Sequence, residues 1–268
     1  SGGPKPVDLA AVGRQTRDVE PDSLDRPRDR ASGSKKQQTK PWLTKMWCIG
    51  TLDSEYLAKM EALLDLYQQP YNPAQPVVCF DECPVQLLGD VTPALPAAPG
   101  TPARVDYEYV RCGTACLLLS VEPLAGWRHV EVSDQRTKVD FARHMKHLVD
   151  EAYPDAEVVH VVLDNLNTHT FGALYEAYPP GEARRIARKL RFHFTPVHAS
   201  WLNMAEIELS VLSRNCLAMR HPSTDALRST ITPWQLDRNA AKTTITWRFT
   251  TLDARAKFHR FYHQASES

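Results

Sequence analysis

The segment Val158-Val159-His160-Val161-Val162-Leu163-Asp164 is a short apolar run, interrupted only by a histidine, that closes with an acidic residue. A second run of the same kind, Val77-Val78-Cys79-Phe80-Asp81, lies earlier in the chain. Runs of this length predict buried strands, each with a carboxylate at its tip. If the two strands are parallel neighbours, their carboxylates meet at one edge of the sheet, where open α/β sheets hold their ligands.

The remaining pattern predicts a mixed sheet with helices on both faces. Helical spacing of apolar or charged residues indicates helices at 52–67, 137–153, 182–189 and 203–219, the first of them capped by Asp53 or Ser54. Further strands are predicted at 113–121, 127–132 and 190–194. The Pro-rich and Ala-rich segment 90–102 is predicted to be a loop, and Pro233 is expected to break or kink a helical pattern at 225–240. A strand hairpin followed by alternating helices and strands indicates an α/β fold.

A third acidic residue, Glu206, lies in the predicted helix that follows Leu202-Asn203-Met204-Ala205. One acid after a strand often marks only the point at which the chain leaves the core. Two such acids and a helix acid form a more specific set, because hard divalent cations prefer several oxygen ligands. Glu208 competes for the third place, but it lies roughly 200° around a helix from Glu206, so only one of the two can face the aspartates.

Three acidic motifs occur in order along the chain. They are Phe80-Asp81-Glu82, then Leu163-Asp164-Asn165-Leu166-Asn167-Thr168-His169, then Thr195-Pro196 leading to Ser200-Trp201-Leu202-Asn203-Met204-Ala205-Glu206-Ile207-Glu208. With Trp247-Arg248-Phe249-Thr250-Thr251 near the end, they resemble the DDE transposases of the mariner superfamily, and most closely its bacterial branch, insertion-sequence family 630. The resemblance begins at about Lys40, which makes 41–268 the expected catalytic domain.

This resemblance implies a ribonuclease-H-like fold in which Asp81, Asp164 and Glu206 are catalytic and hold two Mg²⁺ or Mn²⁺ ions. The implied reaction is phosphodiester hydrolysis and strand transfer, with terminal inverted repeats and target DNA as partners; a homodimer is left open. The match to Leu-Asn-x-x-Glu selects Glu206 over Glu208 and gives Asn203 a supporting place. Asn165 and His169 are implied to orient metal-bound groups or the scissile phosphate, with capping of the following helix as the alternative.

Acidic and basic residues balance at 32 each, which counts mildly against a nucleic-acid-binding protein. The basic residues are clustered, however, and each of two clusters either contacts phosphates or forms a solvated face. The first is Lys35, Lys36, Lys40 and Lys45, and the second is Arg184, Arg185, Arg188, Lys189 and Arg191. The six cysteines are expected to be small buried hydrophobes rather than zinc ligands. Without a signal peptide or an apolar span, we expect a cytoplasmic, nucleoid-associated bacterial protein with no membrane partner.

Residues 1–40 are polar and lack a core-forming pattern, so we expect a disordered or extended segment without a helix-turn-helix module. Relatives use such a module to bind element ends, so the chain is expected to cut DNA poorly and with little end preference. Cys83-Pro84-Val85 and Pro233 also depart from the family pattern. Two alternatives therefore stay open beside the transposase: a weak or inactive remnant that binds DNA, and a stand-alone ribonuclease-H-like nuclease.

Overall fold

A computed structural model describes residues 52–93, 95–104 and 106–265, with the side chains of 263–265 left out. These residues belong to the unit that begins at Leu52. The expectations for residues 1–40 and for the lysine cluster at 35–45 lie outside the described residues. No helix in the described ranges is long and apolar enough to cross a membrane.

A mixed five-stranded sheet in the order β3-β2-β1-β4-β5 forms the centre of the molecule. Its strands are β1 (Val77–Asp90), β2 (Tyr109–Glu122), β3 (Trp127–Ser133), β4 (Val159–Leu163) and β5 (Leu190–Phe194). The first three strands pair antiparallel, while β4 runs parallel to both β1 and β5. This confirms the predicted α/β fold with a mixed sheet.

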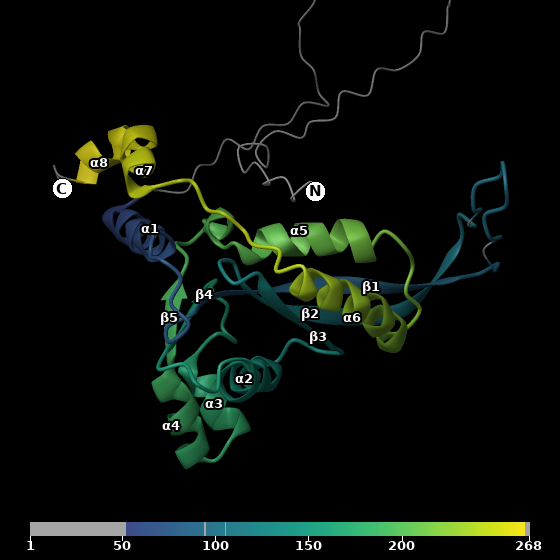
Figure 1. Cartoon of the computed structure of the whole chain (residues 1–268), viewed down its shortest axis with the longest axis horizontal. Coiled ribbons are helices and arrows are strands. Elements are labelled where there is room, and N and C mark those ends of the chain that lie inside the picture. The colour runs from purple at the N-terminus through teal and green to yellow at the C-terminus, as the bar shows by residue number, and fades with distance from the viewer. Residues whose placement is uncertain (1–51, 94, 105, 266–268) are drawn as a thin grey trace, which may run out of the picture. The chain divides into compact units, whose positions relative to one another are not determined.

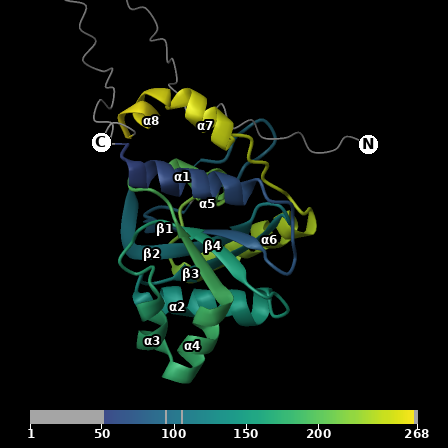
Figure 2. The ribbon, with the colours of Figure 1, turned by 90° about the vertical axis from the view of Figure 1, so that its left-hand side faces the viewer.

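Helices cover both faces of the sheet (Figure 1). One face carries α1 (Ser54–Tyr67), α5 (Ala205–Cys216) and α6 (Thr224–Ala240), and the other carries α2 (Lys138–His147), α3 (Phe171–Ala177) and α4 (Pro180–Lys189). Because side chains alternate along a strand, Cys79 packs into the core under α1 and α5 while Phe80 packs against α2. Two more helices, α7 (Thr251–Lys257) and α8 (His259–Ala265), lie over α1 (Figure 2).

Local sequence signals explain several boundaries. The side chain of Asp53 accepts a hydrogen bond from Tyr56 N and caps α1, as predicted. Thr137 and Asp140 form a capping box at the start of α2, which ends in a π-helical turn at Leu148–Ala152. Of the break or kink expected at Pro233, the break is wrong, because α6 continues through this residue from Thr224 to Ala240.

Two strands are longer than predicted. Asp81 does not end its strand: β1 continues to Asp90 and pairs with β2, which begins at Tyr109 rather than at Gly113. Beyond Cys79, β1 has no described partner on its β4 side. Because proline has no N–H group to donate, a strand tolerates it where one side is unpaired in this way. Pro84 therefore lies inside the strand. The helices α3, α7 and α8 were not predicted either.

Candidate active site

The sheet register brings Asp81 and Asp164 to the same level. Cys79 of β1 pairs with Val162 of β4 in parallel, and each aspartate lies two residues beyond its paired residue. Residues two apart on a strand point to the same face, and Cys79 and Val162 both belong to the core under α1 and α5. Asp81, within β1, thus lies level with Asp164, which directly follows the end of β4.

Asn203 fixes the start of α5 against β1. Its Nδ2 donates to the carbonyl oxygen of Phe80 at 2.8 Å, and its Oδ1 accepts from Ala205 N at 3.1 Å. Tyr67 adds a second anchor by donating its hydroxyl proton to the carbonyl oxygen of Leu202 at 2.7 Å. These buried bonds hold the first turn of α5, which contains Glu206, beside the strand that carries Asp81.

The electrostatics of Asp81 reflect this crowding of acids. Burial, together with the charges of Glu206 and Asp164, raises the pKa of Asp81 to about 7, although a hydrogen bond from Glu82 N opposes the shift. Glu206 itself is exposed. In the described part of the chain, the carboxylate oxygens of Asp81, Asp164 and Glu206 do not all lie within 4.8 Å of one another. The ligand atoms of one other group of three side chains do. Three like charges without a cation between them repel one another.

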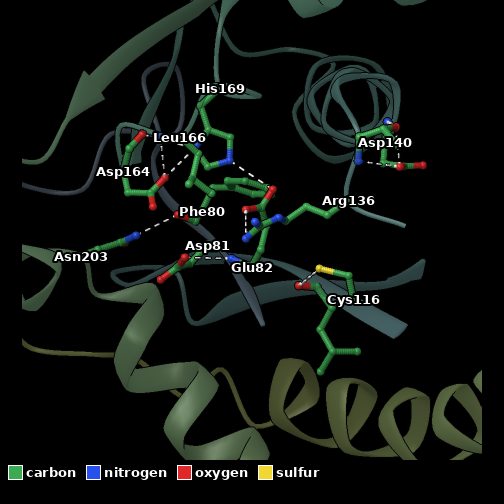
Figure 3. A network of polar contacts seen from close by, with 12 residues as sticks. Phe80, Asp81, Glu82, Cys116, Arg136, Asp140, Asp164, Leu166, His169 and Asn203 are labelled. Carbon is green, nitrogen blue, oxygen red and sulfur yellow. Dashed lines mark hydrogen bonds and ion pairs between the residues drawn. The ribbon is translucent and has the colours of Figure 1, made fainter. Parts of the chain in front are cut away.

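His169 lies between two carboxylates, as Figure 3 shows. Its Nδ1 is 2.7 Å from Asp164 Oδ1 and its Nε2 is 3.1 Å from Glu82 Oε1, and its side chain is fully buried. Burial alone would lower the pKa of His169, but the hydrogen bonds to Asp164 and Glu82 outweigh it and raise the pKa to about 9. Burial alone would raise the pKa of Asp164. The hydrogen bond from His169 and the charge of that ring outweigh burial, so the pKa of Asp164 is lowered.

Glu82 and Arg136 complete this arrangement, and neither was singled out from the sequence. The Glu82 side chain is 1% exposed, and Arg136 Nη1 approaches its Oε2 to 3.9 Å (Figure 3). Arg136 is half-exposed and its charge also acts on Asp164. The only sequence signal for Glu82 was its position beside Asp81. Alternation along β1 puts Glu82 on the opposite face from Asp81, on the side of α2 and His169.

Glu208 serves a structural purpose on another side of α5. It is fully buried and accepts two hydrogen bonds from Arg238, at 2.7 and 2.9 Å. Arg128, also fully buried, lies 2.9 Å from the same carboxylate. Glu208 is thereby committed to two arginines, which leaves Glu206 as the α5 acid near Asp81.

Asn165 is tied to the end of β5 rather than to a helix. Its Nδ2 donates to the carbonyl oxygen of Thr195 at 2.6 Å. The following helix, α3, has Thr170 at its N-cap without a side-chain capping bond. Helix capping, the alternative for Asn165 and His169, is therefore not what these two side chains do.

The basic cluster of α4 divides into two pairs. Arg185 makes two hydrogen bonds to Asp150, at 2.6 and 2.8 Å, and Lys189 donates to the carbonyl oxygens of Tyr153 and Pro154. Arg184 and Arg188 instead line an open groove of about 460 Å³, together with Arg191, Phe171, Tyr175 and Phe192. Because β4 and β5 are parallel, Arg188 and Asp164 lie at opposite ends of these strands.

A family model described as DDE superfamily endonuclease matches residues 76–228, which is more than half of the 268 residues. The chain belongs to this family. The matched region of this DDE endonuclease contains Asp81, Asp164 and Glu206 and all five strands of the sheet. No curated protein matches the sequence significantly.

Solved structures with a similar course of the chain include the Mos1 mariner paired-end complex with Mn, at a TM-score of 0.49 and 14% identity over 84% of this chain. The Mos1 strand transfer complex gives a TM-score of 0.48 and 13% identity over 85% of this chain. The Mos1 paired-end complex with Mg has a TM-score of 0.47 and 14% identity. The match covers 97% of this chain and 85% of the Mos1 chain. The DDE endonuclease chain spans 66% of the length of the first of these and 67% of the second.

Proposed function

We propose that this DDE endonuclease is the catalytic part of a transposase of the mariner superfamily, in the branch of insertion-sequence family 630. It hydrolyses phosphodiester bonds in DNA and transfers the freed strands, with Asp81, Asp164 and Glu206 as its catalytic residues. One observation carries the proposal: the register Cys79 to Val162 sets the two aspartates level, and the α5 turn with Glu206 is anchored beside them.

The three acids suit two Mg²⁺ or Mn²⁺ ions. Their donor set is all oxygen, which hard divalent cations prefer. Burial, with a further contribution from the charges of Glu206 and Asp164, raises the pKa of Asp81, and a bound cation would offset both effects. When bound, the two ions would supply activation of the attacking oxygen and stabilisation of the leaving oxygen in an in-line displacement.

His169 positions Asp164 from behind the site. It donates one N–H to Asp164 and the other to Glu82, so the imidazolium charge keeps the Asp164 carboxylate ionised and restricts its orientation. Asn203 positions Glu206 indirectly. It bonds the carbonyl oxygen of Phe80 and so holds the first turn of α5 against β1. Arg136, which is half-exposed beside Glu82 and whose charge acts on Asp164, would attract a phosphate to this end of the sheet.

DNA contacts away from the acids are proposed for Arg184 and Arg188. These two side chains face the groove beside Phe171 and Tyr175, whereas Arg185 and Lys189 are engaged within the protein. Replacing either Arg184 or Arg188 with Gln should lower the salt dependence of DNA binding by about one phosphate contact. The same replacement of Arg185 serves as the control, for which the salt dependence should stay unchanged.

The substrate class is tested with labelled nucleic acids in Mg²⁺. A DNA duplex carrying terminal repeats, a scrambled duplex and an RNA–DNA hybrid are incubated with the chain, and the ends of the products are mapped. The proposal predicts DNA cleavage that leaves 3′-hydroxyl ends able to join a target duplex. Cleavage of the hybrid alone would identify a stand-alone nuclease, and binding without cleavage would identify a remnant; either result contradicts the proposal.

A further inference from the structure

A second cluster of metal-ligating side chains lies away from the three acids. Among the described residues, the one group of three whose ligand atoms all lie within 4.8 Å of one another is His129, Glu131 and His144. His129 and Glu131 are alternate residues of β3, so both point to the face covered by α2, which carries His144. Since β3 is an edge strand, the cluster is reached from the rim of the sheet.

The ring of His144 is held with one nitrogen free for a ligand. It is completely buried, and its Nε2 is 2.8 Å from Ser120 Oγ. Its Nδ1 faces Glu131 Oε2 at 3.5 Å, a contact with the carboxylate that is too long for a well-formed hydrogen bond. A buried nitrogen with so long a contact is poorly satisfied. A cation between Nδ1 and the carboxylate would satisfy both groups, and Ser120 would act as the outer partner that fixes the ring.

The partly exposed members of the cluster leave a path for an ion. Glu131 has 37% of its side chain exposed, and His129 is half-buried, with its ring 5.3 Å from that of His144. Burial and the neighbouring imidazoles lower the pKa of His129 to about 3, so its ring is in the neutral form that binds metals. His147 stacks on His129 at 4.0 Å, but its Nδ1 is paired with Glu151.

We propose that His129, Glu131 and His144 form a binding site for a borderline transition-metal dication of the Zn²⁺ class. Two imidazole nitrogens and one carboxylate oxygen are the ligands that Zn²⁺ takes in proteins, with water in the remaining position. This donor set differs from the all-oxygen set of Asp81, Asp164 and Glu206, which suits Mg²⁺. The ion cross-links the edge strand β3 to α2, so it stabilises the fold and takes no part in phosphodiester chemistry. The inference is independent of the proposed function.

Cobalt is the probe, because tetrahedral Co²⁺ with nitrogen ligands absorbs visible light strongly while an octahedral all-oxygen site does not. The EDTA-treated chain is titrated with Co²⁺ alone, and Zn²⁺ is then added. We expect an intense band that saturates at about one equivalent and is displaced by Zn²⁺. The band persists in Asp81→Asn and in the control His193→Asn. In Glu131→Gln and His129→Asn the Co²⁺ affinity falls at least about tenfold.

Melting temperatures supply the second readout. Zn²⁺ should raise the melting temperature of the parent and of Asp81→Asn, but not that of Glu131→Gln. A cooperative unfolding transition of Glu131→Gln in EDTA is the control that this variant folds. A parent without the visible band overturns the proposal. So does a band that survives in both Glu131→Gln and His129→Asn. His160 Nδ1 on β4 and His193 Nε2 on β5 lie 2.9 Å apart. Loss of the band in His193→Asn would assign the cobalt to these two histidines and would equally overturn the proposal.

Discussion

The Nε2 atom of His169 lies 3.1 Å from Oε1 of Glu82, and both side chains are almost completely withdrawn from solvent. Because Nδ1 of the same ring is bonded to Asp164, a single imidazolium is the counter-ion for a buried glutamate and for an acid of the site. Removing one partner of a buried ion pair leaves an uncompensated charge, which costs more than the pair itself contributes. The stability of this region and the orientation of Asp164 are therefore linked.

His169→Gln should lower the free energy of unfolding by about 3 kcal/mol, because Glu82 keeps a buried charge without its partner. Adding Glu82→Gln should restore part of that loss, since the amide carries no charge. Urea denaturation of the two single variants and the double variant measures the coupling. The exposed His198, replaced by Asn, should change stability by less than about 0.5 kcal/mol. Additive losses from His169→Gln and Glu82→Gln would refute the coupling.

The two glutamates of α5 should respond in opposite ways to the same substitution. Glu206→Gln removes a charge that repels Asp81, so it should leave stability unchanged or slightly raised while cleavage is lost. Glu208→Gln should cost about 3 kcal/mol, because Arg128 and Arg238 lose their carboxylate. Thermal unfolding and DNA cleavage of both variants decide the assignment. It would be reversed if Glu208→Gln lost cleavage at full stability.

Asn203→Ala should reduce stability by about 1 to 3 kcal/mol, because the carbonyl of Phe80 and the N–H of Ala205 lose a buried partner. Cleavage by the folded variant should fall as well, since the first turn of α5 is no longer fixed beside Asp81. Asn165→Ala is the matched control. It removes one bond from an exposed side chain and should cost less in stability. Equal effects of the two substitutions on both readouts would argue against the anchoring role of Asn203.

His193 provides a pH test of the β4–β5 packing. Burial and the charge of His160 lower the pKa of His193 to about 4, whereas an unfolded histidine titrates near ~6.5. Between these values only the unfolded chain binds the proton, so the free energy of unfolding falls as the pH is lowered through this window. His193→Gln should therefore gain about 2 kcal/mol relative to the parent between pH 7.5 and pH 4.5. Urea denaturation at both pH values measures the difference. A stability difference that does not change with pH would show that His193 titrates normally.

The parts of the fold that were predicted are those in which a local pattern matches the packing. The strand at 190–194 has the predicted bounds, and Asp53 caps the first helix as expected. The extension of β1 through Pro84 was missed, because an acid, a cysteine and a proline in succession look like the end of a strand. That part of β1 is held by its pairing with β2, which begins about twenty residues away along the chain.

The candidate site was predicted to a similar extent. The register of β1 and β4 confirms that the two strands are parallel neighbours, but Asp81 lies within β1 and not at its end. Glu82 was not predicted, because its significance depends on His169, a contact between residues far apart in the chain. The division of the α4 basic cluster was not predictable either, since Asp150 and the carbonyls that engage Arg185 and Lys189 belong to the α2 region.

Asp81, Asp164 and Glu206 are proposed to act as one cation-dependent site on DNA. Cleavage of a labelled terminal-repeat duplex is measured with Mg²⁺, Mn²⁺ or EDTA for the parent and for Asp81→Asn, Asp164→Asn and Glu206→Gln, each shown to be folded. We expect cleavage by the parent in either metal, none in EDTA, and a rate reduced by a factor on the order of 100 or more in every variant. Cleavage at the parental rate by any one of the three variants, or cleavage that persists in EDTA, would show that the three acids do not form such a site.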